Sequence, residues 1–512
     1  MQEMKALEMT ADHEFDKDNH DRNSSDTANS TSVILKQNLI SPDAQKTDNP
    51  DYLSFDDVLN DIGFGKYQLK VYLIMACLAL AEGAQVMVFT MMIPILEVQW
   101  GIQEWLNGLQ ASLIFVSFLI GSVVSGQISD RLGRKKPIIF SSGVMFVLSL
   151  GSASSPNIVV LILFRVFLGL LVGFFAPLGA TMLAELTPLA LRGRYMALIQ
   201  LSLSFGMIFG ICMGLAILSD LTHGNWRLLI VVCTLPAILA FVCSVLFLEE
   251  SPRFEIVLGN NESAFKIIDK INVMNGSRKF GKLSDEQRKK MIRWSTNLNK
   301  TFISEDVASV RALFKDHGKM ITPLLWIDWF ASSFIYYGIV IFLPDTIEKI
   351  NHEGKGTESN DFIRLLVSTI TELFAVLLAA LLIDMKHFGR KNSMIIFYEL
   401  TAIVALIVYL DETSHFIYWA TISKFFITMT AVFCFQYTSE VYSTKCRTTG
   451  LGMASGIGRL GGMAMPWVCV SLADINPVAP FLAFAALGMV VGVINFLLPY
   501  DTTGKELDTV EN

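Results

Sequence analysis

Residues 126–136 read GQISDRLGRKK and follow the second of twelve long apolar segments in the chain. Asp130 can accept charge-assisted hydrogen bonds from Arg134 or from exposed N–H groups at a helix start. Gly126 and Gly133 permit close helix contact and a tight turn. We expect this cluster to hold one side of a membrane protein shut and to break when its parts move apart. The alternative is an ordinary basic loop.

The same chemistry recurs in the second half of the chain. Asp130, Arg134, Glu185 and Arg192 have the counterparts Asp384, Arg390, Glu440 and Arg447, at separations of 254, 256, 255 and 255 residues. This repeat predicts two parallel six-helix units with a solute site between them near the middle of the membrane. The second copy is two residues longer between its Asp and its Gly, and Ala380 replaces the first glycine. We therefore expect a looser gate in that half.

The composition indicates lipid as the solvent. Only 17% of the 512 residues are charged and 52% are apolar, whereas ordinary soluble domains carry about a quarter charged residues. The net charge of −7 comes largely from the polar N-terminal tail and the loops. No basic stripe is available to neutralise phosphates, so we expect no nucleic-acid partner.

Each apolar segment is about 20 residues long, enough to cross the hydrocarbon core as a helix. The predicted spans are 69–95, 106–129, 137–155, 157–184, 194–219, 227–248, 321–344, 362–384, 392–410, 415–439, 448–472 and 479–499. Continuous rather than alternating apolar runs argue against a β-barrel. The predicted fold class is an all-α membrane protein with twelve transmembrane helices in two pseudo-symmetric six-helix halves.

Lys and Arg crowd the loops after spans two, four, eight and ten, which predicts that these loops and both termini are cytosolic. The predicted domains are a disordered cytosolic tail (1–53), an N-terminal half (54–249), a cytosolic linker with one or two surface helices (250–319), a C-terminal half (320–500) and a cytosolic tail (501–512). A second polar insert, 345–361, would face outside. Residues 54–62 suggest a short amphipathic helix lying on the inner leaflet. The host membrane is either the plasma membrane or an intracellular vesicle membrane.

The cysteines and histidines suggest no further chemistry. The candidate external loops hold no cysteine pair, so we expect no structural disulfide. No histidine falls inside a span, since His415 is only the first residue of the tenth, and no CxxC or HExxH motif occurs, so we expect neither a metal nor a cofactor. No Walker loop is present, so ATP is not the expected energy source.

Charges inside spans are the best clues to the solute, because each is costly in hydrocarbon and tends to face a wet cavity. Glu82 lies near the middle of span one and shares a helix face with Gln85 and Phe89. A buried carboxyl group there suits a proton-coupling site or a contact to a cation; the alternative is a structural helix–helix pair.

Arg165 in span four and Lys424 in span ten are near-equivalent in the repeat. Opposed across a cavity, they could clamp a carboxylate or pair with Glu82 and Glu372; a purely structural pairing is equally consistent. Tyr336 and Tyr337 are candidate pocket liners or ordinary core residues. The candidate gating residues are Gly126, Asp130, Arg131, Gly133, Arg134, Lys135, Glu185, Arg192, Asp384, Arg390, Glu440 and Arg447.

The loop at 126–136 strongly resembles the signature of the major facilitator superfamily. Further motifs resemble its sugar-porter and organic-ion members: Arg165 with Gly169 and Gly173, Glu185 with Arg192, ESPR at 250–253 and DTTGKE at 501–506. GFGKY at 63–67, YYG at 336–338, and Glu440 with Tyr442, Arg447 and Gly450 are similar to the synaptic-vesicle-protein-related branch. In that branch, an acidic residue usually occupies the place of Glu82, and Glu372 matches another acidic position.

The resemblance implies a secondary active transporter and not an enzyme. We expect it to move a small organic solute, an organic ion, by alternating access, with or without coupling to protons. The expected partners are the solute, the lipid bilayer and, in the coupled case, protons, and we expect a monomer. A sugar or neutral-solute facilitator, or a transceptor that has kept the fold but lost transport, are the alternatives. A channel would need a polar through-pore, and no such pattern is visible.

Overall fold

The computed structural model describes residues 53, 55–276, 283–304, 313–314, 318–352, 361–382, 389–411, 415–442 and 447–502. Within these ranges, some side chains lie outside the description. Among the predicted gating residues, Asp384 and the side chains of Gly126, Asp130, Arg131, Arg192 and Arg447 lie outside the described residues.

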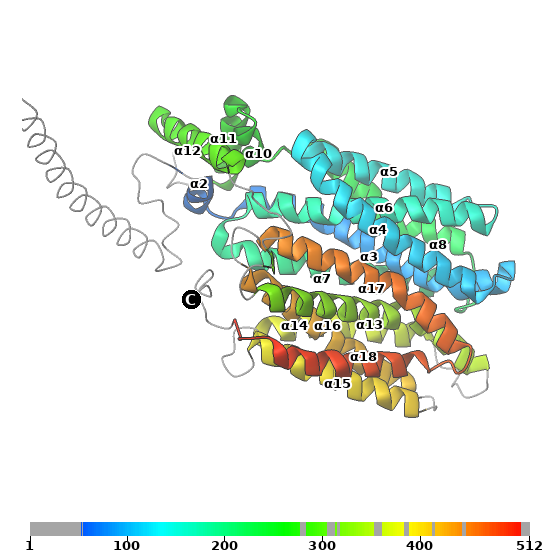
Figure 1. Ribbon diagram of the computed structural model, residues 1–512. Helices are drawn as coiled ribbons and strands as arrows, with labels where there is room; N and C mark the ends of the chain where they lie inside the picture. The colour runs from blue at the N-terminus through cyan, green and yellow to red at the C-terminus, as the bar shows by residue number, and fades with distance from the viewer. Residues whose placement is uncertain are drawn as a thin grey trace, which may run out of the picture.

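The described chain is almost entirely helical (Figure 1). Its helices are α2 (Phe55–Ile62), α3 (Lys66–Trp100), α4 (Glu104–Leu132), α5 (Lys135–Ala153), α6 (Ile158–Leu186), α7 (Leu189–Ile217), α8 (Trp226–Cys233), α9 (Leu235–Phe247), α10 (Pro252–Val257), α11 (Asn261–Asn275), α12 (Asp285–Ser304), α13 (Gly318–His352), α14 (Asp361–Leu382), α15 (Arg390–Leu410), α16 (Phe416–Val441), α17 (Arg447–Ala473), α18 (Pro480–Ile494) and the short 3₁₀ helix η2 (Asn495–Leu497).

The helices form two bundles that lie side by side in Figure 1, α3–α9 above α13–α18. Within each bundle, equivalent helices pack together: α3 on α7 and α4 on α6 in the first, α13 on α17 and α14 on α16 in the second. The bundles meet where α4 packs on α17, α7 on α14 and α3 on α13. The predicted arrangement of two six-helix halves is confirmed.

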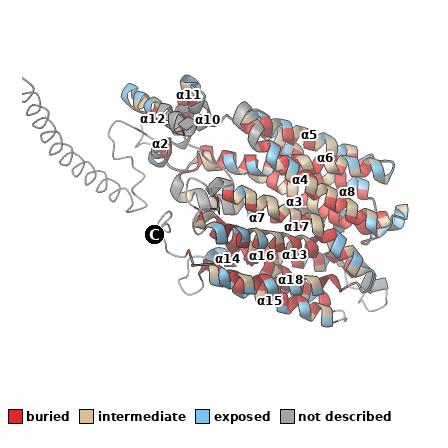
Figure 2. Cartoon of the chain, in the orientation of Figure 1, coloured by how far each residue is buried: buried red, intermediate tan, exposed pale blue. Residues whose placement is uncertain are grey.

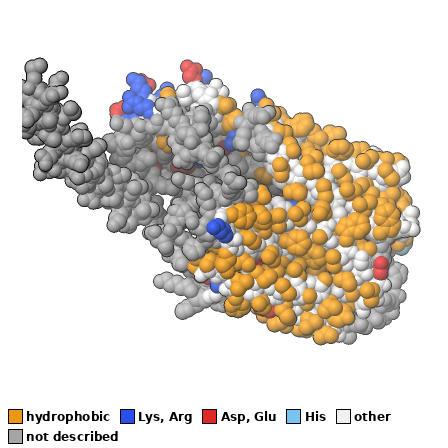
Figure 3. All heavy atoms as spheres, in the orientation of Figure 1, with side chains coloured by type: hydrophobic (Ala, Val, Ile, Leu, Met, Phe, Trp, Pro, Cys, Tyr) orange, Lys and Arg blue, Asp and Glu red, His pale blue; other side chains and the backbone are white. Residues whose placement is uncertain are grey.

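The outer surface of the bundle is apolar. Eleven helical spans of the described chain are long and apolar enough to cross a membrane; the glycine-rich α17 is long enough but is not among them. Side chains such as Leu381, which is 72% exposed, point outward, and the exposed residues on these helices form stripes (Figure 2). Figure 3 shows hydrophobic side chains covering this face, while charged side chains gather on α11 and α12.

The bundle has two ends, which we name the linker end and the far end. The linker end carries α2 and α10–α12 (Figure 1) and the turn at Gly133 between α4 and α5. The far end carries the turn at Gly101 between α3 and α4 and the loop between α7 and α8. Prediction placed the linker end in the cytosol, and that orientation stays a prediction.

Small residues allow close helix contact inside each half. A Cβ at Gly83 of α3 would overlap the backbone carbonyl of Leu203 in α7, and a Cβ at Gly461 of α17 would overlap that of Phe330 in α13. These glycines let the backbones touch, which is how helices associate where lipid offers no hydrophobic drive.

The described contacts between the halves lie from the middle of the bundle to the far end. Ser112 Oγ of α4 donates a hydrogen bond to the Met463 carbonyl of α17 at 2.8 Å. A Cβ on Gly214 of α7 would lie 3.4 Å from the Phe362 ring of α14. Towards the linker end of α17, by contrast, a Cβ on Gly452 would have no neighbour within 4 Å. Among the described residues, the contacts between the halves are therefore closer at the far end.

Span six is present as one apolar stretch, Trp226–Phe247, made of two helices. The helices break at Thr234, because Pro236 has no N–H to continue the ladder and the Thr234 hydroxyl bonds the Ile230 carbonyl at 2.7 Å. Two other boundary predictions were wrong in detail. The first part of the predicted polar insert at 345–361 continues α13 as far as His352. The linker has three helices, α10–α12, rather than one or two.

The predicted amphipathic helix exists as α2, but it does not offer its apolar face to lipid. Phe55, Val58 and Leu59 are at most 1% exposed and belong to a cluster that includes Phe265 and Ile268 of α11. The apolar stripe of a helix can be buried by protein as well as by a membrane, and here α11 and the first half bury it.

Asn275 at the end of α11 joins the linker to the start of α3. Its amide nitrogen donates to the Gly63 carbonyl at 3.2 Å and to Gln68 Oε1 at 2.8 Å. Its oxygen accepts from the backbone N–H of Tyr67 at 3.0 Å. The linker helices are thus fastened to the first half at the N-terminus of the helix that carries Glu82.

Candidate functional site

A cavity opens where α3, α4 and α6 of the first half meet α13 of the second. It holds about 570 Å³ of empty space, part of it open to the surroundings. Its lining residues are Glu82, Gln85, Val86, Phe89, Ala111, Ile114, Phe115, Phe118, Arg165, Leu168, Gly169, Val172, Tyr337 and Ile341. A mostly apolar wall with a few polar groups is typical of a small-molecule site. Four of the predicted solute residues, Glu82, Gln85, Arg165 and Tyr337, lie in it.

Glu82, Gln85 and Phe89 lie on one face of α3, as their spacing predicts, and all three line the cavity. No described residue donates a hydrogen bond to the Glu82 carboxylate. The guanidinium of Arg459 on α17 acts on it electrostatically. Glu82 is therefore a carboxylate that faces the cavity and keeps its hydrogen-bonding capacity unused.

Arg165 is 3% exposed and does not pair with Glu82, which was one of its expected partners. Its Nη1 donates to Gln85 Oε1 at 3.1 Å, and its Nη2 lies 3.9 Å from the sulfur of Met92. Arg165 Nε and Gln85 Nε2 are buried without a hydrogen-bond partner. The polar floor of the cavity thus has donors that a solute could use.

The other expected pairing does form. Lys424 Nζ of α16 lies 3.0 Å from Glu372 Oε2 of α14, and both side chains are 2% exposed. The other carboxylate oxygen accepts from the Tyr336 hydroxyl at 2.9 Å and from the Ser204 hydroxyl at 3.0 Å. Because Ser204 lies on α7, this cluster joins the two halves in the middle of the bundle. Lys424 does not line the cavity with Arg165, so the two do not form a clamp in this structure.

The neighbouring tyrosines have different surroundings. Tyr336 belongs to the Glu372 cluster, whereas Tyr337 lines the cavity and contacts Phe115 edge-on at 4.7 Å. The Tyr337 hydroxyl accepts a hydrogen bond from Arg459 Nη1 at 3.2 Å. Arg459 was not among the predicted residues, although a cation inside a predicted span was the signal that could have found it.

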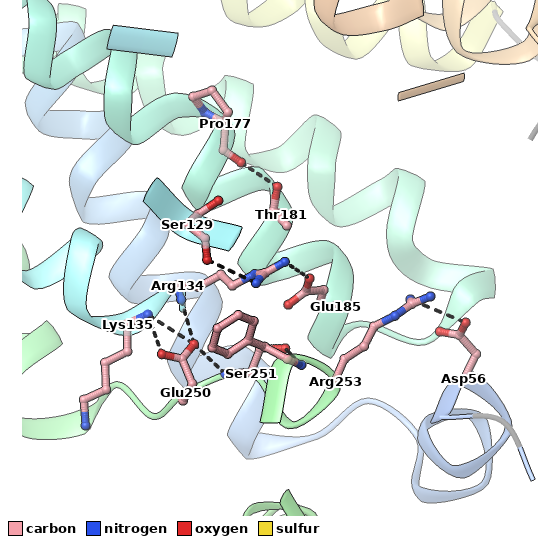
Figure 4. A network of polar contacts seen from close by, with 11 residues as sticks. Asp56, Ser129, Arg134, Lys135, Pro177, Thr181, Glu185, Glu250, Ser251 and Arg253 are labelled. Carbon is pink, nitrogen blue, oxygen red and sulfur yellow. Dashed lines mark hydrogen bonds and ion pairs between the residues drawn. The ribbon is translucent and has the colours of Figure 1, made fainter. Parts of the chain in front are cut away.

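A polar cluster at the linker end contains residues of the first predicted gate, all from one half of the protein; their gating role stays a prediction (Figure 4). Arg134 Nη2 lies 3.0 Å from Glu185 Oε1. Glu250 accepts from the backbone N–H groups of Arg134 at 2.7 Å and of Lys135 at 3.2 Å, so its negative charge lies at the N-terminus of α5. Gly133 has φ +85°, and a Cβ there would overlap the Glu250 carboxylate.

The second half repeats this arrangement. Arg390 Nη2 lies 3.1 Å from Glu440 Oε1, and Asp501 accepts from the backbone N–H groups of Arg390 and Lys391 at 3.1 and 3.0 Å. Thr502 also donates to Glu440 at 2.7 Å. The longer loop of this half therefore does not lengthen the ion pair. The roles of Glu250 and Asp501 as acceptors at helix starts were missed, because each lies more than 100 residues from the N–H groups that it binds.

The family model for sugar (and other) transporters matches residues 46–512. The chain belongs to that family of the major facilitator superfamily. The chain is 26% identical over 478 residues to the bovine synaptic vesicle 2-related protein, covering 89% of this chain and 82% of that one. It is 29% identical over 485 residues to the organic cation/carnitine transporter 7 of Arabidopsis thaliana, with 88% and 95% covered.

Among solved structures, the inward-open conformation of the xylose transporter XylE from E. coli superimposes with a TM-score of 0.68 at 18% identity. The match covers 86% of this chain and 98% of that one. The major facilitator fold with twelve helices, and membership of the branch related to synaptic vesicle protein 2, agree with the resemblance seen in the motifs. Like these relatives, the chain is a multi-pass membrane transporter and not an enzyme.

Proposed function

We propose that this chain is a secondary active transporter of a small organic ion and that the solute binds in the cavity around Glu82 and Arg165. The observation that carries the proposal is the position of this cavity. Its charged groups come from α3 and α6 of the first half, and Tyr337 and Ile341 of the second half complete its wall. A solute bound there touches both halves, so their relative movement can expose it to either side.

The far end, where α4 packs on α17, is the closed side in this proposal. Access is then from the linker end, where Gly452 has open space around it. The two linker-end ion pairs, Arg134–Glu185 and Arg390–Glu440, each join helices of one half. We propose that they keep each half rigid as it rocks, with the linker end in the cytosol. The polybasic turns on that end support this orientation.

A relative that is named an organic cation/carnitine transporter supports an organic ion rather than a sugar as the solute. The cavity supports it too, because an unpartnered carboxylate and a buried guanidinium are better matched to charged groups than to neutral hydroxyls. We propose a plasma or vesicle membrane as the location and a monomer as the working unit.

Uptake into proteoliposomes tests the proposal. The purified chain is supplied with radiolabelled organic cations, organic anions, zwitterions and sugars, with and without a pH gradient. Saturable uptake of an ion that liposomes without protein do not show is the expected result. Accumulation of a sugar alone would support a sugar facilitator, and binding without accumulation would support a transceptor.

Glu82 is our candidate for proton coupling. The groups that face it are Gln85 on its own helix, Arg165 of α6, Tyr336 and Tyr337 of α13, and Arg459 of α17. Glu82→Gln should remove the effect of a pH gradient on uptake. Glu399→Gln is the control, since Glu399 also lies within a spanning helix but contacts α18 at Gly492 outside the cavity. Unchanged coupling in Glu82→Gln would exclude Glu82 as the proton site.

A further inference from the structure

Arg459 of the second half contacts two residues of the cavity wall. It lies on α17 three residues before Gly462, on the face that meets α4. Its guanidinium carbon lies 5.2 Å from the centre of the Phe118 ring of α4, and its Nη1 donates to the Tyr337 hydroxyl at 3.2 Å. Phe118 and Tyr337 both line the cavity. One cation thus touches an aromatic residue of each half.

Glu82 lines the same cavity as the two residues that Arg459 contacts, so the charge of Arg459 acts on it across the boundary between the halves. No hydrogen bond fixes Glu82 to Arg459 or to any other described residue. Its attraction to Arg459 can therefore be replaced by an attraction to another cation. The remaining wall holds the rings of Phe89, Phe115 and Phe118. A carboxylate surrounded by aromatic rings is a site where an organic cation gains from both the charge and the ring faces.

We propose that Arg459 is a resident cation: it neutralises Glu82 when the cavity is empty, and an organic cation displaces it on binding. This inference rests on the proposed function and adds to it the charge of the solute and a residue that links solute binding to movement of the halves. Glu82 lies on α3 and Arg459 on α17, so exchanging one cation for the other changes an attraction between the two halves.

The other cationic side chains near the cavity cannot supply an exchangeable attraction between the halves. Arg165 lies in the same half as Glu82 and is bound to Gln85, so its charge gives no attraction between the halves. Lys424 lies in the second half but is paired with Glu372. Arg459 donates a hydrogen bond to the Tyr337 hydroxyl and contacts the Phe118 ring. It can leave both without depriving a buried carboxylate of its ion pair.

The exchange explains how an empty carrier and a loaded carrier can both move. A carboxylate without a hydrogen-bond or ion partner is costly to enclose in a mostly apolar cavity, so a cavity in which neither Arg459 nor a solute cation balances Glu82 resists closure. When Arg459 balances Glu82, the empty carrier can change from one open side to the other. When an organic cation balances Glu82, the loaded carrier can make the same change. A carrier without the charge at residue 459 should therefore exchange solute for solute but return poorly when empty.

Binding is measured first, on the full chain in nanodiscs, with radiolabelled tetraethylammonium as the probe and benzoate as the anionic comparison. Arg459→Gln should bind tetraethylammonium more tightly by a factor on the order of ten, because the competing charge is gone. Arg459→Lys keeps the charge and should stay close to the unmodified chain. Arg227→Gln is the matched control: Arg227 also stacks on an aromatic ring and makes one hydrogen bond, but it lies at the far end.

Transport is measured next, in proteoliposomes with the same probe. Arg459→Gln should keep exchange of external for internal tetraethylammonium and lose most of its net uptake, whereas Arg459→Lys and Arg227→Gln should keep both. A merely structural role of Arg459 would lower exchange and net uptake together. Folding of each variant is checked by gel filtration in detergent.

Several results would overturn the inference. Weaker or unchanged tetraethylammonium binding in Arg459→Gln would mean that Arg459 does not compete with the solute. Benzoate binding that Arg459→Gln abolishes would make Arg459 a contact for anions. Absence of tetraethylammonium binding to every variant would exclude a cation site, and uptake of an anion or zwitterion in that case would leave the proposed transport function standing.

Discussion

Replacing Lys424 should lower the free energy of unfolding of this protein more than replacing any exposed lysine. The size of the loss follows from the contacts of Lys424. Lys424 Nζ lies 3.0 Å from Glu372 Oε2 and both side chains are 2% exposed. Lys424→Met deletes the ammonium and leaves a buried carboxylate without its ion partner. Breaking a buried ion pair in this way costs about 3–5 kcal/mol.

Two hydroxyl donors reduce the expected loss. Tyr336 and Ser204 still donate to Glu372 at 2.9 and 3.0 Å, and the carboxyl group can also take up a proton. We therefore expect a loss of about 3 kcal/mol, the lower end of that range. The double variant Lys424→Met, Glu372→Gln should be more stable than the sum of the two single losses predicts, because neither charge is left alone; couplings of about 0.5–3 kcal/mol are usual for such contacts.

The assay is unfolding by sodium dodecyl sulfate in mixed micelles, followed by tryptophan fluorescence. Lys290→Met is the control. The side chains of Lys290 and its ion partner Glu286 are 30% and 79% exposed to solvent. Ion pairs this accessible to water contribute less than about 0.5 kcal/mol to stability. A Lys424→Met variant as stable as Lys290→Met would refute the reasoning. A double variant no better than the sum of the singles would show that the two residues do not interact.

Three further predictions concern the linker end. Gly133→Ala should destabilise the fold by about 1–3 kcal/mol, because φ +85° with ψ −174° is a backbone conformation that essentially only glycine adopts. Gly452→Ala, with open space around it, should be neutral or slightly stabilising in the same unfolding assay. Asn275→Ala should cost about 1–3 kcal/mol and speed hydrogen exchange in the first turn of α3; unchanged exchange there would contradict the role given to Asn275. Arg134→Gln and Arg390→Gln should lose similar stability, since their ion pairs have nearly equal lengths, and a loss confined to Arg134→Gln would instead support a looser second half.

The sequence predicts the architecture well, because its evidence is periodic and repeated. Lipid demands long apolar helices, so the spans are visible as segments, and a separation of about 255 residues links Arg134 with Arg390 and Glu185 with Glu440. In the structure, Arg134 pairs with Glu185 and Arg390 pairs with Glu440. The constant spacing therefore predicted that the two halves match, but not these partners, since the contact expected for Arg134 was with Asp130.

Choices between partners could not be predicted in this way. Arg165 binds Gln85 rather than Glu82, because the rotation of α6 against α3 decides which polar group its guanidinium meets. The apolar face of α2 is buried by α11, and amphipathic spacing does not distinguish protein from lipid as the covering phase. The role of Arg459 was not predicted, because it lies in the glycine-rich sequence of α17, and that pattern indicates close helix packing rather than a charged site.

Alternating access around the Glu82 cavity is the central claim, and distances measured by pulsed electron resonance on the chain in liposomes test it most directly. One spin-label pair spans the far end, at Trp105 and Ile475, and one spans the linker end, at Leu132 and Leu381; all four residues are exposed. Addition of a transported ion should change the two distances in opposite directions, one end opening as the other closes. Distances that stay fixed, or that change in the same direction while transport continues, would contradict the account.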